Sequence, residues 1–353
     1  MRLAALLMLG SALLWGVALA APRGTAPPMP AVDDASFVRG VALGLFATDS
    51  EWDYGPLVDE IAGRGATDVL VVVNAYQSNR FASDIAARPG RTPSDATIAR
   101  TLHQVRAAGM RAALMPVVRL EERAPHEWRG VIAPADGLDA WFAAYTRFVL
   151  PLAHIASAQG AQRFVLASEL SSLERYESRW RGVIAKLRAA FPGSLTYSAN
   201  WDHAHEVPFW DALDEVGVTG YFPLLGDGAF SEASLAAAWH APRAELRALA
   251  RRVGKPVLLT EIGYTSRRDA AARPWDDSGD AAIDLRAQQQ LYRGFCDALS
   301  EAPSVSGFYV WNWFGFGGPR DAGFTPRGKP AATELAACFA RQWRANTLAG
   351  NER

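Results

Sequence analysis

The chain has 353 residues, half of them hydrophobic, which is enough to bury a large core. Acidic and basic side chains nearly cancel and leave a formal net charge of −1. This balance argues against a nucleic acid or an anionic membrane as a partner, because either would favour a strongly basic surface.

The amino terminus has the pattern of a secretory signal peptide. Arg2 precedes the apolar run 3–19, and Ala18-Leu-Ala20 is a small-x-small cleavage site. We expect residues 1–20 to be cleaved off and the protein to be exported to the periplasm or the cell exterior. A retained membrane anchor is the alternative, but no basic stop-transfer cluster follows the run, so we expect no stable anchor after cleavage. Residues 21–36 are rich in Pro and Ala and predict a flexible leader.

Strand-like apolar runs alternate with helix-like segments over the rest of the chain, which is typical of a parallel sheet with helical crossovers. In chain order the pattern predicts strands at 41–46, 68–74, 111–118, 163–169, 194–200, 215–221, 256–261 and 305–311. The helices that follow them are predicted at 54–64, 95–108, 137–159, 177–191, 208–213, 231–253, 284–301 and 331–344. These units predict an α/β fold, a single (β/α)8 TIM barrel over 37–345, with a tail at 346–353. A doubly wound open sheet is the alternative, but no phosphate-binding glycine turn follows the first strand.

The chain has two cysteines, Cys296 and Cys338, which fall on the last two predicted helices. These helices would be neighbours in a barrel, and export would place them in an oxidising compartment. The sequence therefore predicts a disulfide between them, with two separate buried thiols as the alternative.

Two glutamates, Glu169 and Glu261, each end a short apolar run that we interpret as a buried strand. An ionisable group is costly to place there unless it serves a function. In a (β/α)8 barrel the carboxyl ends of the strands line the active site. A pair of carboxylates at that end is what cleavage of a glycosidic bond requires, so we interpret the two glutamates as candidate catalytic residues.

Other predicted strand ends carry side chains suited to a sugar. Aromatic rings stack on the apolar face of a pyranose ring, while Asn and Tyr bond its rim of hydroxyl groups. The candidates for substrate binding at strand ends are Asn74, Asn200, Trp201, Tyr221, Trp311 and Trp313. We therefore expect an oligosaccharide or a polysaccharide as the partner.

Patterns for other chemistries are weak. Residues 323–329 have the spacing of a P-loop, but Pro330 stands where a Ser or Thr should bind magnesium. We interpret His203, His205 and Glu206 as a polar loop rather than a metal site, since no further ligand is obvious. We therefore expect neither a cofactor nor a metal.

Several segments together resemble glycoside hydrolase family 113, over about residues 38–340. They are Ser168–Glu174, Tyr221–Leu224, Thr260–Tyr264 and Gly307–Trp313, with Trp128–Gly130 and Ala272–Trp275 in support. The resemblance implies a barrel of the retaining clan, with catalytic glutamates on strands four and seven, and hydrolysis of β-1,4-mannan. Galactan, glucan or an envelope polysaccharide would need the same two acids, so the substrate stays open.

The resemblance also implies roles for single residues. Glu169 would be the general acid/base and Glu261 the nucleophile, with Tyr221 bonded to the carboxylate of Glu261. The indole of Trp311 would form the floor of the sugar subsite at the cleaved bond.

Further binding residues follow from the matching segments, which add Tyr264 and Trp275 to the candidates. Ser168 stands where many members of the wider clan have an Asn that bonds the sugar 2-hydroxyl. Asn200 is a candidate to replace that contact.

A retaining site holds its carboxyl groups about 5–5.5 Å apart, and we expect that spacing here. The two acids should have different pKa values, with that of Glu169 raised so that it holds the proton of the pair. Two other interpretations stay open. One is a secreted, catalytically inactive barrel that binds glycans. The other makes the two glutamates structural partners of arginines such as Arg119.

Overall fold

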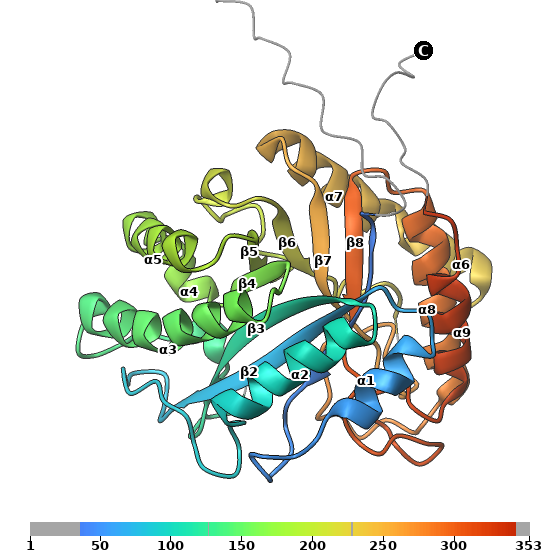
Figure 1. Ribbon diagram of the computed structural model, residues 1–353. Helices are drawn as coiled ribbons and strands as arrows, with labels where there is room; N and C mark the ends of the chain where they lie inside the picture. Colours follow the sequence, from blue (N-terminus) through green and yellow to red (C-terminus); the bar gives the residue numbers. More distant parts are fainter. Residues whose placement is uncertain (1–35, 126, 227–228, 344–353) are drawn as a thin grey trace, which may run out of the picture.

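Eight parallel strands close into a barrel in the computed structural model, which describes residues 36–125, 127–226 and 229–343 (Figure 1). Each strand pairs with its neighbour in sequence, and the last pairs back to the first. The strands are β1 (Val38–Gly44), β2 (Asp68–Gln77), β3 (Arg111–Leu120), β4 (Arg163–Ser168), β5 (Ser194–Ala199), β6 (Val216–Thr219), β7 (Val257–Ile262) and β8 (Val305–Val310). The predicted (β/α)8 barrel is confirmed. The predicted signal peptide and tail lie outside the described residues, as does nearly all of the predicted leader.

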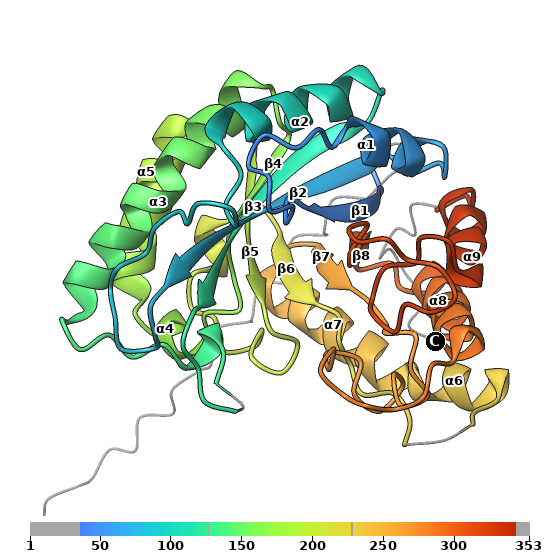
Figure 2. The same ribbon diagram turned by 90° about the horizontal axis from the view of Figure 1, so that it is seen from below.

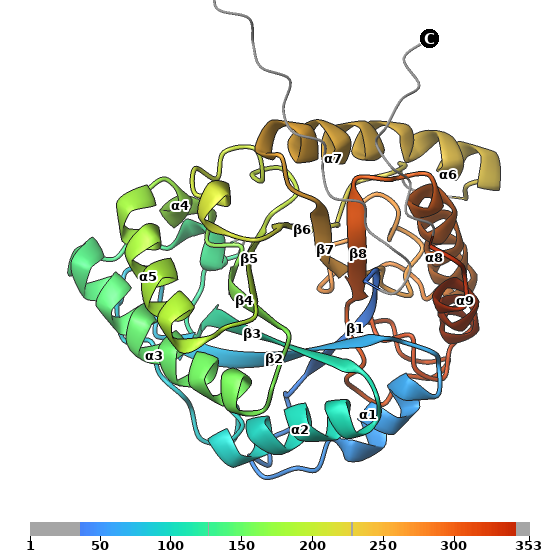
Figure 3. The ribbon, with the colours of Figure 1, turned by 45° about the horizontal axis from the view of Figure 1, so that its top comes forward.

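Helices form a ring around the strands (Figure 3). They are α1 (Gly55–Ala62), α2 (Asp95–Ala107), α3 (Leu138–Ala158), α4 (Ser171–Glu174), α5 (Glu177–Ala190), α6 (Glu232–Ala238), α7 (His240–Val253), α8 (Leu285–Ser300) and α9 (Pro330–Phe339). Two 3-10 turns, η1 (Arg129–Val131) and η2 (Trp210–Ala212), lie in loops. Within the described ranges, no helix combines the length and the apolar character needed to cross a bilayer.

The structure departs from the predicted elements in a few places. The segment 208–213 holds only the turn η2, and the segment 231–253 is two helices that meet at Trp239. Strand β2 continues past Asn74 to Gln77. The sequence does not predict η1 or α4, because each is about one turn long and too short to show a helical period.

Two apolar layers form the core, one inside the barrel and one between strands and helices. Leu70 and Val72 of β2 belong to the inner layer, whereas Val71 and Val73 pack outward against the helices. Because both faces of each strand are buried, the strands form continuous apolar runs in the sequence. This is why the strands could be predicted.

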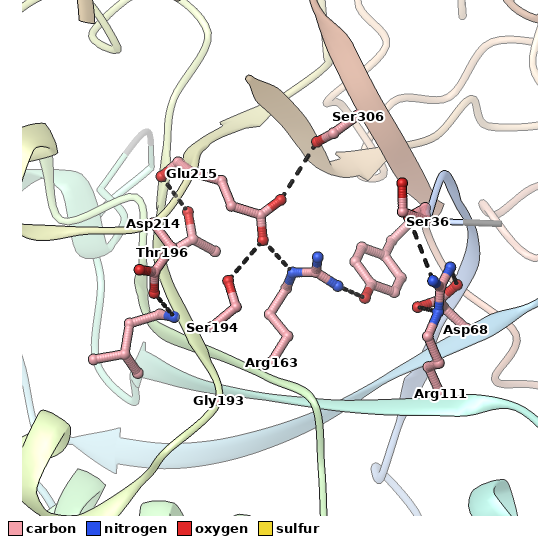
Figure 4. Close-up of polar contacts among 12 residues, drawn as sticks. Ser36, Asp68, Arg111, Arg163, Gly193, Ser194, Thr196, Asp214, Glu215 and Ser306 are labelled. Carbon is pink, nitrogen blue, oxygen red and sulfur yellow. Dashed lines mark hydrogen bonds and ion pairs between the residues drawn. The ribbon is translucent and has the colours of Figure 1, made fainter. Parts of the chain in front are cut away.

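A charged network fills the amino-terminal end of the barrel (Figure 4). Arg163 donates through Nε to Oε1 of Glu215 at 2.6 Å, and its guanidinium also donates to the hydroxyl of Tyr309 at 3.0 Å. Ser194 and Ser306 donate to the same carboxylate. The network joins β4, β5 and β8 and gives each buried charge a partner.

A disulfide joins Cys296 of α8 to Cys338 of α9, with 5.9 Å between the two Cα atoms. The predicted bridge is confirmed, and the alternative of two separate thiols is wrong. The two cysteines are 42 positions apart. For a loop of that length the chain-entropy model gives a stabilisation of about 4 kcal/mol.

We expect Glu215→Ala to lower the free energy of unfolding by about 3–5 kcal/mol, because it leaves the guanidinium of Arg163 buried without its counter-charge. Urea unfolding followed by tryptophan fluorescence measures the loss. The matched control is Asp211→Ala, which removes a surface partner of Arg181 that is 68% exposed. That variant should lose less than about 1 kcal/mol. Equal losses in the two variants would contradict a stabilising role for the buried network.

Candidate active site

The carboxyl ends of the strands lie at the face seen in Figure 2, where the loops 45–54, 78–94, 263–284 and 311–329 emerge. Glu169 directly follows β4, and Glu261 is the last residue but one of β7. Both glutamates are therefore at the predicted end of the barrel. Only 8% of Glu169 and 3% of Glu261 is exposed, so their carboxyl groups are largely desolvated.

Both carboxylate oxygens of Glu261 accept a hydrogen bond. The hydroxyl of Tyr221, just past β6, donates to Oε2 at 3.0 Å. The hydroxyl of Ser168, the last residue of β4, donates to Oε1 at 3.2 Å. The expected bond between Tyr221 and Glu261 is therefore present, and the two donors fix the orientation of the carboxylate.

A guanidinium contacts the other glutamate. Arg129, on the turn η1, donates to Oε2 of Glu169 at 2.6 Å and through Nε to the backbone oxygen of Ser168 at 3.1 Å. Charge-assisted contacts of this kind favour the ionised carboxylate. The sequence suggested Arg119 as a partner, but Arg119 is exposed on β3 and makes no ion pair with either glutamate in the described part of the chain.

The backbone of Glu169 adopts an unusual conformation. Its φ is 54°, and no other residue except glycine has a positive φ in the described ranges. Such a conformation costs on the order of 1–3 kcal/mol and persists only where the surroundings hold it. Strained residues of this kind gather at functional sites, which agrees with the place of Glu169 at the barrel mouth.

The two carboxyl groups are electrostatically coupled. Burial, and after it the charge of Glu169, raises the pKa of Glu261 to about 7, while Arg129, Tyr221 and Ser168 oppose this shift. The proton of the pair therefore lies on Glu261, whereas we expected it on Glu169. The cause is the unequal surroundings: Arg129 stabilises a charge on Glu169, and Glu261 has only neutral donors in a buried place.

Asn74 and Trp311 reach the same end of the barrel. Asn74 continues the inward-facing side of β2 that carries Leu70 and Val72, and it is buried. Its Oδ1 has no hydrogen-bond partner among the described residues. Trp311 directly follows β8, is half-buried and packs on the inner apolar layer. An unsatisfied amide and a partly open indole suit the hydroxyl groups and the face of a sugar ring.

Three other candidates lie farther out on this end. Asn200 and Trp201 directly follow β5 and are half-buried. The side-chain oxygen of Asn200 accepts from the hydroxyl of Thr219 at 3.2 Å, and Trp201 packs against Phe222. Trp275, on the loop 263–284, is 49% exposed. The structure thus leaves all three accessible to a ligand.

Tyr264 and Trp313 are not in the site, so these two predictions are wrong. Both are fully buried in the outer apolar layer. The ring of Tyr264 packs edge-on against Tyr292, and the indole of Trp313 donates to Glu60 of α1 at 3.1 Å. The ladder between β7 and β8 shifts its register, so strand alternation cannot be extrapolated to the residues beyond it.

Two contacts of the carboxyl pair are not predicted from the sequence. Arg129 belongs to a segment that resembles family 113, and that membership is its only signal. Its contact with Glu169 spans 40 residues, so it depends on the path of a loop. The sequence marks Ser168 only as the place of an absent Asn, whereas its hydroxyl bonds Glu261.

A closed barrel with two coupled carboxyl groups at the ends of β4 and β7 defines a class of protein, the barrel glycosidases. Comparison with known families makes the assignment specific: the model of Glycoside Hydrolase Family 113 matches residues 45–318. The chain belongs to this family. It is a glycoside hydrolase that acts on O-glycosyl bonds.

Solved structures share the fold. A GH113 β-1,4-mannanase is similar with a TM-score of 0.78 and 23% identity, over 87% of this chain and 100% of that chain. The GH113 β-mannanase AaManA from Alicyclobacillus acidocaldarius, in complex with ManMIm, has a TM-score of 0.77 and 27% identity, over 86% and 97% of the two chains. A GH5_18 protein from Streptomyces cattleya, in complex with GlcNAc, has a TM-score of 0.55 and 15% identity, over 88% and 82%. No curated protein matches this chain.

We expect kcat/KM for glycoside hydrolysis to fall about tenfold per pH unit above pH 7, because bond cleavage needs one proton on the pair of acids and the pair loses it at the pKa of Glu261, which is about 7. The bond from Tyr221 lowers that pKa, so Tyr221→Phe should move the alkaline limb to higher pH. Initial rates across the range from acid to alkaline pH measure both effects. An alkaline limb centred near 4.5, the ordinary value of a glutamate, would contradict Glu261 as the group that carries the proton.

Proposed function

We propose that the protein is an exported β-mannanase that cleaves β-1,4-linked mannan by double displacement with retention of configuration. One observation carries the proposal: Glu261, held by Tyr221 and Ser168, is coupled to Glu169 at the mouth of a family 113 barrel. The choice of substrate follows from similarity to the GH113 structures, which are those of β-mannanases.

The proposed reaction has two steps. In the first, ionised Glu261 forms a bond to the anomeric carbon as the bond to the leaving oxygen breaks, and Glu169 gives its proton to that oxygen. In the second, Glu169 takes a proton from water, and the water oxygen displaces Glu261 from the anomeric carbon. The pair holds one proton before the first step and one after the second. Moving that proton from Glu261 to Glu169 does not change the net charge of the site.

Arg129 fits the second step of this scheme. Its contact with Glu169 favours the carboxylate, which is the form that must act as the base. For the first step Glu169 needs a proton, so the contact with Arg129 has to weaken when the leaving group is bound. The strength of the contact between Arg129 and Glu169 would then decide which of the two acids carries the proton.

Retention is supported by the coupling of the two acids, since the charge of Glu169 affects the titration of Glu261. An inverting pair is separated by about 6.5–9.5 Å to admit a water molecule, which weakens such coupling. The shorter spacing of about 5–5.5 Å stays a prediction.

Export is supported by two features at opposite ends of the chain. The amino terminus has the signal-peptide pattern, and the disulfide between Cys296 and Cys338 is of a kind that persists in oxidising compartments. We propose cleavage after Ala20, which would leave no membrane anchor on the mature protein.

The full chain, recovered from the periplasm or the medium, is expected to begin at Ala21 and to release reducing ends from β-1,4-mannan in a panel that includes galactan and glucan. Proton NMR of the first product should show the β anomer, because two inversions restore the configuration. Glu169→Ala and Glu261→Ala should each lower turnover about a thousandfold or more.

Each part of the proposal has its own contrary result. Release of the α anomer would contradict double displacement, and an uncleaved amino terminus would contradict export by this signal. Cleavage of galactan or glucan but not mannan would replace the substrate. A parent protein that binds mannan without cleaving it, as Glu261→Gln also would, favours the inactive glycan-binding barrel.

The large apolar side chains that are exposed among the described residues gather at one end of the barrel. They are Trp52, Phe81, Trp275, Ile283 and Phe316. All lie on the loops that follow β1, β2, β7 or β8, which are neighbours in the closed sheet (Figure 2). An arc of mostly aromatic side chains at the end of the barrel that carries the two acids suits successive pyranose rings of a long chain. It therefore supports a polymeric substrate.

We expect Phe316→Ala and Trp275→Ala each to lower kcat/KM on polymeric mannan by about threefold to tenfold, the equivalent of one stacking contact. Hydrolysis of mannotriose, which is too short to span the arc, should change less than about twofold. The matched control is Ile283→Ala, on the same loop as Trp275 but without an aromatic face. Equal losses on polymer and trisaccharide would exclude distal binding by these rings.

A further inference from the structure

The left-handed backbone of Glu169 needs neighbours that hold it in place. Its own amide donates to the backbone oxygen of Ser198 at 2.8 Å. The next amide, that of Leu170, donates to the hydroxyl of Tyr197 at 2.8 Å. Both acceptors belong to β5, so this strand fixes the backbone on either side of the strained residue.

Tyr197 is itself rigidly placed. Its ring is fully buried and packs against Trp180, Phe209 and Trp210, with ring centroids 5.5–6.1 Å apart. A tyrosine hydroxyl has a single proton to donate. That proton goes to Oε1 of Glu174, at 2.7 Å, which leaves the oxygen free to accept from the amide of Leu170.

Glu174 is a buried carboxyl group with no ion-pair partner in the described part of the chain. It ends the short helix α4, directly after the turn made by Glu169, and is 2% exposed. Within the described ranges its Oε1 accepts only from Tyr197, and its Oε2 has no hydrogen-bond partner. Burying a carboxyl group in this way is costly, and the reaction proposed above gives Glu174 no direct part.

We propose that Glu174 is a positioning residue for Glu169 and acts through the hydroxyl of Tyr197. The carboxylate fixes the direction of the tyrosine proton, and the tyrosine oxygen then holds the amide that follows Glu169. The chain of bonds keeps the acid/base in one place while it first gives and then takes a proton. This inference rests on the proposed role of Glu169.

The charge state of Glu174 enters the same chain. Burial raises its pKa to about 7, against the bond from Tyr197 and the nearby His203, while Glu206 and Asp202 raise it further. Protonation weakens the carboxyl group of Glu174 as an acceptor. The tyrosine hydroxyl is then less well fixed, and its hydrogen bond from the amide of Leu170 should weaken as the pH falls through neutrality.

The first test compares Glu174→Gln, Tyr197→Phe and the double variant. We expect kcat on mannan to fall about tenfold to a hundredfold in each single variant, with KM within about twofold. The double variant should be no slower than the slower single one, because both changes break one chain of bonds. The matched control is Tyr145→Phe, which removes another buried tyrosine hydroxyl, bonded to the oxygen of Leu166 on β4. Its kcat should stay within about twofold of the parent.

A second readout separates positioning from general damage to the fold. An aryl mannoside with a dinitrophenol leaving group needs no acid in the first step, and azide needs no base in the second. We expect Glu174→Gln to keep the rapid first release of dinitrophenol and to regain turnover when azide is added. Equal slowing of both steps, with no effect of azide, would overturn the proposal.

The pH profile gives a third readout. In the parent, Glu174 gains a proton as the pH falls through about 7, so kcat/KM should drop on the acid side to a plateau about tenfold to a hundredfold lower. In Glu174→Gln this acid step should disappear, while the alkaline limb set by Glu261 should remain. An active parent whose three variants match it in kcat and pH profile would refute the role of Glu174 and leave the proposed function intact. A parent that cleaves no glycoside would refute the proposed function itself.

Discussion

Two carboxyl groups buried close together repel each other when both are ionised. At the mouth of this barrel the neighbouring side chains determine which of the two carries the charge. Arg129 compensates a charge on Glu169, whereas Tyr221 and Ser168 offer Glu261 only neutral donors. A guanidinium favours a carboxylate more strongly than hydroxyl groups do, so the shared proton goes to Glu261. The partners of each acid, more than its place on a strand, therefore decide which form it takes.

The two ends of the barrel differ in how well their buried polar groups are partnered. At the amino-terminal end, Arg163 and Glu215 are buried but fully partnered, which suits a stabilising role. At the carboxyl end, the buried side-chain oxygen of Asn74 has no partner among the residues that the structure describes, and the two acids are held in a costly coupled pair. This division agrees with the general behaviour of (β/α)8 barrels, in which one end stabilises the fold and the other binds and reacts.

The sequence predicted the barrel and the two acids because both depend on local patterns. Strands buried on two faces are continuous apolar runs, and a carboxylate that ends such a run is conspicuous. Side chains beyond the strand ends were harder to place. Trp311 faces the inner layer but Trp313 faces outward, and the pairing of β7 with β8 shifts its register shortly before Tyr264. The contact of Arg129 could not be predicted at all, because it joins a turn after β3 to a residue 40 positions later, beyond α3 and β4.

The two acids are fixed by different means, and the difference fits the roles that we propose for them. Glu261 lies within β7, where strand pairing sets its backbone, and in the proposed reaction it needs one orientation for attack. Glu169 lies past the end of β4, and in the proposed reaction it faces the leaving oxygen in one step and a water molecule in the next. Strand pairing alone does not hold a residue at that place. A strained turn bonded on both sides to β5 gives it a fixed position without extending the strand, so the cost in backbone energy and the buried carboxyl of Glu174 have a common explanation.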